Sequence, residues 1–236
     1  VLDTVTEMLT QANPYERNPA TVSLGSVVAT AGDRFLSEEP SDTGFHLQML
    51  QRLAEIEASL QRHPRRVALL ERALALAPAA DLDPAALEAL HAQAIDAQWR
   101  AGNLDTAEAA IAAWQARTGS LPLAMQLTQL RVMMFRGNND AATRIFTRLQ
   151  SESARAPALF RHDVLTEASF LAMRKGEMAE SLQRLQEAGT LLDPEDPGQR
   201  AEWLRHRANL ATALGNNERY AESANLLLSL VEETRS

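Results

Sequence analysis

The sequence predicts an all-α fold, a solenoid of helical hairpins wound into a right-handed superhelix of about 11 to 13 helices. The first observation is a glycine that recurs about every 39 residues, at Gly102, Gly137, Gly176 and Gly215, between segments of helical hydrophobic period. The second is a composition rich in Ala and Leu with only 5% aromatic residues, which favours helix over sheet. The third is that no segment shows the alternating pattern of a strand.

Each recurring glycine is expected to end the first helix of a hairpin. Glycine adopts the left-handed conformation that closes a helix at little cost. An Asn or Asp after it can cap the next helix, and a small residue about five positions on lets the two helices approach. Stepping back 39 residues from Gly102 reaches His63-Pro64, a fifth break without a glycine. We therefore predict five hairpins, the first of them degenerate.

Hydrophobic period and helix breakers set the expected boundaries. Residues 1–40 are predicted to form an N-terminal linker and capping helices, with a short helix over 1–9 and a longer one over 21–39. Residues 41–236 are predicted to form the hairpins as a single continuous domain. The paired helices are expected at 43–62 with 65–77, 84–101 with 104–117, 121–136 with 140–153, 157–175 with 178–192, and 198–214 with 218–235.

Composition excludes several classes of function. The formal net charge of -8 disfavours electrostatic binding of nucleic acid along the whole surface. The chain has no cysteine, which excludes disulfides, thiolate zinc sites and cysteine nucleophiles. No stretch approaches about 20 apolar residues, so the chain as given is expected to be soluble.

Catalytic and metal-binding motifs are missing from the sequence. There is no glycine-rich phosphate loop and no HExxH motif. No two of the five histidines lie at metal-ligand spacing on one helix. His162 and Asp163 are neighbours in sequence, and residues one apart on a helix do not share a face. We therefore predict a chain that is not an enzyme and has no metal ion and no cofactor.

A recognition surface for a protein or peptide is the function that the sequence favours. In a stack of hairpins the first helices line the concave face, and their outward residues fall about six, three and two positions before the loop glycine, with others one turn earlier. The predicted partner-binding residues are Asp96, Trp99, Arg100, Arg131, Phe170, Arg174, Arg205 and Asn209. Arginine can bond carboxylates and carbonyls, and aromatic residues give apolar contact. The alternative for the apolar members of this column is packing between hairpins, which would involve Met134, Phe135, Phe170 and Met173.

The hairpin pattern resembles the tetratricopeptide repeat over about residues 43–235. The last copy is the clearest, with the triplet Asn209-Leu210-Ala211 followed by Gly215 and Tyr220-Ala221. This copy is similar to the longer repeat variant of kinesin light chains, in which the asparagine of an Asn-Leu-Ala triplet faces the groove and bonds peptide backbone. The resemblance implies that role for Asn209.

A second resemblance concerns the N-terminal part. Asn13-Pro14, the stretch 21–36 and the segment 69–74 look like the region that follows the kinase domain and membrane helix in bacterial serine/threonine kinases with C-terminal tetratricopeptide repeats. None of the kinase catalytic motifs lies in this chain. The resemblance implies a periplasmic sensor domain, tethered to a membrane helix before Val1, that binds a protein or peptide. A cytoplasmic scaffold, the regulatory half of a transcription regulator, and pairing into a homodimer are left open.

Overall fold

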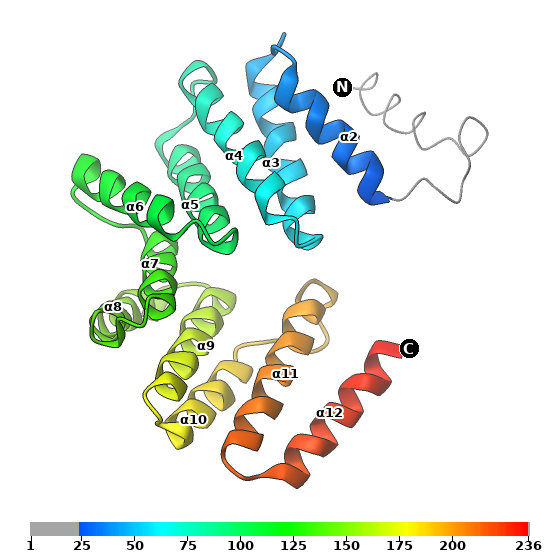
Figure 1. Cartoon of the computed structure of the whole chain (residues 1–236), viewed down its shortest axis with the longest axis vertical. Helices are drawn as coiled ribbons and strands as arrows, with labels where there is room; N and C mark the ends of the chain where they lie inside the picture. The colour runs from blue at the N-terminus through cyan, green and yellow to red at the C-terminus, as the bar shows by residue number, and fades with distance from the viewer. Residues whose placement is uncertain (1–23, 236) are drawn as a thin grey trace. The chain divides into compact units, whose positions relative to one another are not determined.

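The computed structural model describes residues 24–235, and within that range it contains eleven α-helices and no strand (Figure 1). This confirms the predicted all-helical fold class. The helix expected over residues 1–9 lies outside the described residues. No helix in the described range is both long enough and apolar enough to cross a membrane. The chain forms two compact units, one ending at Ser120 and the other beginning at Leu121.

The first unit contains α2 and two hairpins. Helix α2 spans Leu24–Ser37. The hairpins are α3 (Thr43–Ser59) with α4 (His63–Leu76), and α5 (Pro84–Arg100) with α6 (Leu104–Thr118). These boundaries agree with the predicted ones to within three residues. The apolar side of α2 is buried, and Val28, Ala31 and Phe35 join one core with residues of α3, α4 and α5.

A buried ion pair holds α2 to the first hairpin. The side chain of Glu57 on α3 is fully buried, and its Oε1 accepts a hydrogen bond from Nε of Arg65 on α4 at 3.2 Å. The same arginine donates through Nη2 to the carbonyl of Ala29 at 2.6 Å and to Oδ1 of Asp33 at 2.8 Å, both on α2. A buried carboxylate is tolerated when it is paired and hydrogen-bonded in this way. Arg65 therefore joins three helices.

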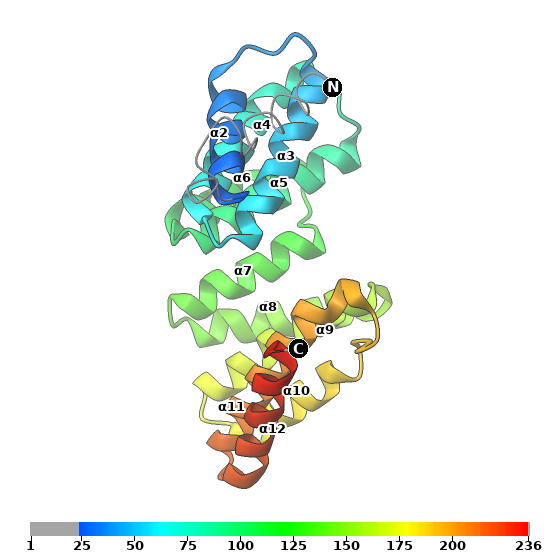
Figure 2. The same ribbon diagram turned by 90° about the vertical axis from the view of Figure 1, so that its right-hand side faces the viewer.

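The second unit contains three hairpins (Figure 2). They are α7 (Leu123–Phe135) with α8 (Asn139–Glu152), α9 (Ala158–Arg174) with α10 (Met178–Gly189), and α11 (Arg200–Asn216) with α12 (Tyr220–Arg235). Their core is formed by Leu, Val, Met and Ala side chains, for example Leu130, Leu149 and Leu171. Every helix boundary again lies within three residues of the predicted one.

Each of the five hairpins turns through one residue in the left-handed conformation. At this residue the N–H donates to the carbonyl three residues back, and the next N–H donates to the carbonyl five residues back, which is the Schellman motif. Three of these residues are predicted glycines: Gly102 (φ 83°), Gly137 (φ 75°) and Gly176 (φ 82°). The other two are Gln61 (φ 58°) and Glu218 (φ 62°).

The prediction that Gly215 ends a helix is wrong. Helix α11 continues to Asn216, and the turn falls at Glu218 instead. The reason is the side chain of Asn217, whose Nδ2 donates to the carbonyl of Met178 on α10 and to that of Ala213, both at 2.8 Å. A contact between two hairpins therefore places the end of this helix, and the left-handed turn falls on a glutamate.

Candidate binding site

When the hairpins are aligned on the left-handed residue, the same four positions lie on one side of every first helix. Positions two, six, nine and thirteen before that residue are spaced by four, three and four, so they lie on one side of a helix. We call this surface the first-helix face. In the second unit it comprises Ala124, Thr128, Arg131 and Phe135 of α7, Asp163, Glu167, Phe170 and Arg174 of α9, and Arg205, Asn209, Thr212 and Asn216 of α11. All of these except Thr128 are at least partly exposed.

Seven of the eight residues predicted from the sequence fall on this face. Arg205 and Asn209 were predicted from Gly215, which does not form the turn. They still lie on the face, because they stand thirteen and nine residues before Glu218, which does form it. Trp99 lies three residues before Gly102 and is also partly exposed. Asp96, Trp99 and Arg100 belong to the first unit, and the other five belong to the second.

Contacts within the second unit join the first helices side by side. Nε of Arg131 on α7 donates to Oε1 of Glu167 on α9 at 2.6 Å, and the two side chains are only 11% and 12% exposed. Nδ2 of Asn216 on α11 donates to Sδ of Met173 on α9 at 3.4 Å. The first-helix face is therefore continuous across these three helices, and Arg131 is engaged by its own chain.

The residues of the face in the first unit also bond one another. Oδ2 of Asp96 accepts from Nη1 of Arg66 on α4 at 2.7 Å and from Nε of Arg100 at 3.0 Å. The guanidinium of Arg100 lies 5.1 Å from the ring centroid of Trp99, within the range of a cation–π contact. These residues form a local cluster that joins α4 and α5.

Two polar residues of the face stand apart from such pairs. Arg174 is exposed and Asn209 is partly exposed, and neither side chain has a hydrogen bond or ion pair with any residue in the described part of the chain. Arg205 forms an ion pair with Glu202 at 2.9 Å, and its side chain is 61% exposed, so this pair is weak. The face thus offers donors on α9 and α11 that its own side chains do not occupy.

The apolar residues divide between the two interpretations that the sequence left open. Met134 is buried and packs in the core of the second unit, as the packing alternative expects. Phe135 is 69% exposed at the end of α7. Phe170 and Met173 are partly exposed on α9.

A hollow of about 520 Å³ over α3 lies outside the set of residues predicted from the sequence. The described residues that line it are all on that helix, and they include Gln48, Arg52 and Glu55 of the first-helix face together with Phe45 and Met49. The first hairpin has Gln61 instead of a glycine at its turn, so the glycine pattern gave no register for α3. Only the structure shows that the turn falls at Gln61, and with it which residues of α3 belong to the first-helix face.

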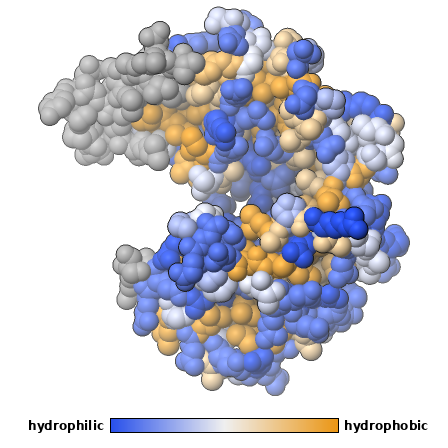
Figure 3. Space-filling view, turned by 180° about the vertical axis from the view of Figure 1, so that it is seen from behind, coloured by the Kyte–Doolittle hydropathy of each residue, from blue (hydrophilic) through white to orange (hydrophobic). Residues whose placement is uncertain are grey.

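A second missed feature is a row of exposed apolar side chains on α12. Tyr220, Leu227, Leu228 and Val231 are between 46% and 67% exposed. Tyr220, Leu227 and Val231 are spaced by seven and four, which places them on one side of the helix, and Leu228 flanks that side. Apolar patches interrupt the hydrophilic surface on the face of the molecule drawn in Figure 3. Contiguous exposed apolar surface often marks a contact with another protein.

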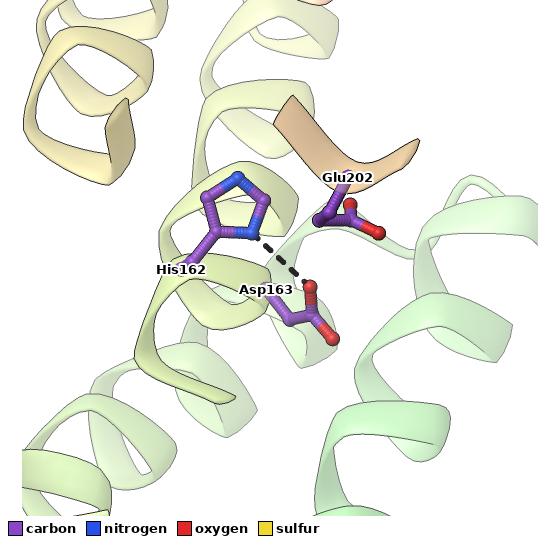
Figure 4. Close-up of side chains that lie close together, drawn as sticks. All are labelled: His162, Asp163 and Glu202. Carbon is purple, nitrogen blue, oxygen red and sulfur yellow. Dashed lines mark hydrogen bonds and ion pairs between the residues drawn. The ribbon is translucent and has the colours of Figure 1, made fainter. Parts of the chain in front are cut away.

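A third missed feature is a polar cluster between α9 and α11 (Figure 4). Nδ1 of His162 lies 3.3 Å from Oδ1 of Asp163, so these neighbours approach each other although adjacent helical residues point in different directions. Nε2 of His162 lies 3.3 Å from Nδ1 of His206. Glu202, in the first turn of α11, completes the cluster. Burial lowers the pKa of His206 to about 4, with a smaller effect from the charge of His162, so the His206 ring is neutral near pH 7.

Comparison with solved structures shows what kind of fold this is. A putative kinesin light chain from Podosopora anserina with nearly identical TPR-like repeats matches at 20% identity and a TM-score of 0.53, covering 82% of this chain and 96% of that chain. BtubC (BKLC) from P. vanneervenii matches at 14% identity and a TM-score of 0.62, covering 89% of this chain and 91% of that chain. The chain therefore has the tetratricopeptide-like helical-repeat fold. No protein-family model and no curated protein sequence matches it.

Proposed function

We propose that this chain is a non-catalytic binding domain that holds an extended protein or peptide segment on its first-helix face. The repeat fold supports the proposal, because stacked hairpins provide a long surface rather than an enclosed pocket. The apolar side chains exposed beside the polar ones support it as well, since such a mixture suits peptide recognition.

The observation that carries the proposal is the pair of unengaged donors on neighbouring first helices. Arg174 on α9 and Asn209 on α11 lie on the same face, and α9 and α11 are joined by the contact between Met173 and Asn216. An amide can bond both an N–H and a carbonyl of an extended backbone, and a guanidinium can bond a carboxylate in bidentate fashion. An acidic peptide in extended conformation fits both groups.

The experiment compares two double variants in a selection against a displayed library of peptides that contain carboxylate side chains. We expect the wild-type chain to retain a set of acidic peptides and the Arg174→Ala/Asn209→Ala variant to bind them at least about tenfold more weakly. Neither residue bonds another described side chain, so the variant is expected to unfold at the same urea concentration as the wild type.

The matched control is Arg144→Ala/Asn225→Ala, which removes the same two residue types from exposed positions on α8 and α12, both second helices. It should bind like the wild type. If the selected peptides bind equally well to the Arg174→Ala/Asn209→Ala variant, or if no peptide is selected, the first-helix face is not the binding surface.

We also propose a more specific role: the chain is the periplasmic sensor domain of a membrane-anchored bacterial serine/threonine kinase. Binding of a partner to this domain would then change the activity of the attached kinase. The resemblance of residues 13–74 to that family supports it. The test is the complete gene product: a kinase domain and a membrane helix encoded before Val1 are expected. A winged-helix or ATPase module in that place would instead favour the regulatory half of a transcription regulator.

A further inference from the structure

We propose that His162, Asp163 and Glu202 form a binding site for one divalent transition-metal ion, best suited to Zn²⁺, between α9 and α11. This inference goes beyond the peptide-binding function and does not depend on it. The sequence predicted no metal site because the search was for ligands spaced along one helix. Here two ligands come from α9 and one comes from the first turn of the next hairpin.

The first support is the separation of the ligand atoms. One ligand atom from each residue lies within 4.8 Å of those of the other two. Zinc bonds of about 2.0–2.2 Å in tetrahedral geometry place ligand atoms about 3.3–3.6 Å apart. The Nδ1 of His162 and the Oδ1 of Asp163 are already 3.3 Å apart. This distance is longer than the usual 2.9–3.0 Å of an N–H···O hydrogen bond. Only the Glu202 carboxylate, on a flexible side chain at the helix end, must approach.

The second support is the way the imidazole of His162 is held. Its side chain is 1% exposed, and its Nε2 lies 3.3 Å from Nδ1 of His206 and 3.5 Å from Oγ1 of Thr166. Metal-binding histidines are commonly oriented by a hydrogen bond at the ring nitrogen that does not bind the metal. With a metal on Nδ1, the Nε2–H of His162 would point toward Nδ1 of His206, which lies 3.3 Å away. The orienting partner is thus in place.

The third support is the mixed donor set and its accessibility. One imidazole nitrogen with two carboxylate oxygens suits Zn²⁺ better than Ca²⁺ or Mg²⁺, which prefer oxygen ligands alone. Asp163 and Glu202 are 36% and 23% exposed, so an ion can enter and water can fill the remaining coordination position. Arg205 competes for Glu202 through its ion pair of 2.9 Å, but an exposed pair of this kind contributes little.

Binding of the ion would link the fourth and fifth hairpins. Side chains on α9 and α11 would then coordinate the same metal ion. An ion that binds only the folded state stabilises that state. We therefore expect stoichiometric Zn²⁺ to raise the midpoint of thermal unfolding and to slow hydrogen exchange in α9 and α11.

The test is calorimetric titration of the chelator-treated, tag-free chain with Zn²⁺. We expect one ion per chain, and X-ray absorption at the zinc edge should show one imidazole nitrogen together with oxygen donors. The variants Asp163→Asn and Glu202→Gln change partly exposed side chains and should keep the fold, and each should weaken Zn²⁺ binding by at least about tenfold. Ca²⁺ should bind much more weakly than Zn²⁺.

The matched control is Glu180→Gln/Glu187→Gln on α10, which removes two carboxylates that pair with Arg184 outside the cluster. It should bind Zn²⁺ like the wild type. The proposal is overturned if the wild type binds no stoichiometric Zn²⁺, or if the Asp163→Asn and Glu202→Gln variants bind as tightly as the control.

Discussion

Two glycines of the second unit should respond to alanine with opposite signs. Gly137 has φ 75° at the end of α7, whereas Gly215 lies inside α11 with no positive φ. The recurring pattern in the sequence predicts both as the loop glycine of a repeat. We expect Gly137→Ala to destabilise the second unit and Gly215→Ala to stabilise it.

The magnitudes follow from the surroundings of each glycine. A Cβ on Gly137 would meet nothing closer than Nη2 of Arg174 at 3.9 Å, so the cost is that of the left-handed conformation alone. That cost is roughly 1–2 kcal/mol, partly offset by the reduced freedom of the unfolded chain, which leaves about 1 kcal/mol. A Cβ on Gly215 would meet Oγ of Ser223 at an ordinary 3.7 Å. Alanine is favoured over glycine within a helix by about 0.8–1.0 kcal/mol, and near the last turn about half of this is expected.

The assay is urea unfolding combined with hydrogen exchange read on peptides from residues 121–236. The local readout assigns the effect to the second unit, where all three glycines lie. Gly176→Ala serves as the matched control: its φ is 82° and a Cβ there would contact nothing within 4 Å, so it should behave like Gly137→Ala. If Gly215→Ala destabilises the unit as much as these two substitutions, Gly215 is at the turn and the described end of α11 is incorrect.

Three further predictions concern side chains in the second unit. Gly189→Ala should be destabilising by about 1–3 kcal/mol although Gly189 is helical, because its Cβ would lie 2.7 Å from Nε2 of the buried His206; an unchanged urea midpoint would contradict this packing. Arg131→Ala should cost about 2 kcal/mol of stability because it removes a donor from the nearly buried carboxylate of Glu167, and a loss below about 0.5 kcal/mol would show that this pair is not formed in solution. Burial lowers the pKa of His206 to about 4 in the folded state against an ordinary 6.5, so protonation of this ring opposes folding. The free energy of unfolding should therefore keep the full contribution of the neutral ring above about pH 6.5 and lose it as the pH falls toward 4. Urea midpoints measured with a chelator present should show this decline, and His206→Gln should remove it; the same decline in both proteins would assign it to other groups.

Local chemistry allowed the sequence to predict most of the fold. Helical period and proline breaks placed every described helix to within three residues. Gly102, Gly137 and Gly176 were correctly assigned to turns, because only glycine adopts the left-handed conformation at low cost. Where glutamine or glutamate takes that conformation, at Gln61 and Glu218, composition carries no such signal.

The candidate binding face could be predicted only in part. Seven of the predicted residues lie on the first-helix face because a periodic helix fixes which residues share a side. The sequence could not show that Arg131 is engaged by Glu167 while Arg174 and Asn209 are not, since this depends on which side chains meet across neighbouring helices.

The sequence by itself therefore determined the helices, the hairpins and the outward-facing side of the first helices α5, α7, α9 and α11, because these follow from contacts only a few residues apart. Tertiary structure alone decided the end of α11, where Asn217 bonds the carbonyl of Met178, and the approach of Glu202 to His162 and Asp163. Both depend on residues about 40 positions apart that are brought together by packing of one hairpin against the next, and no local pattern encodes that distance.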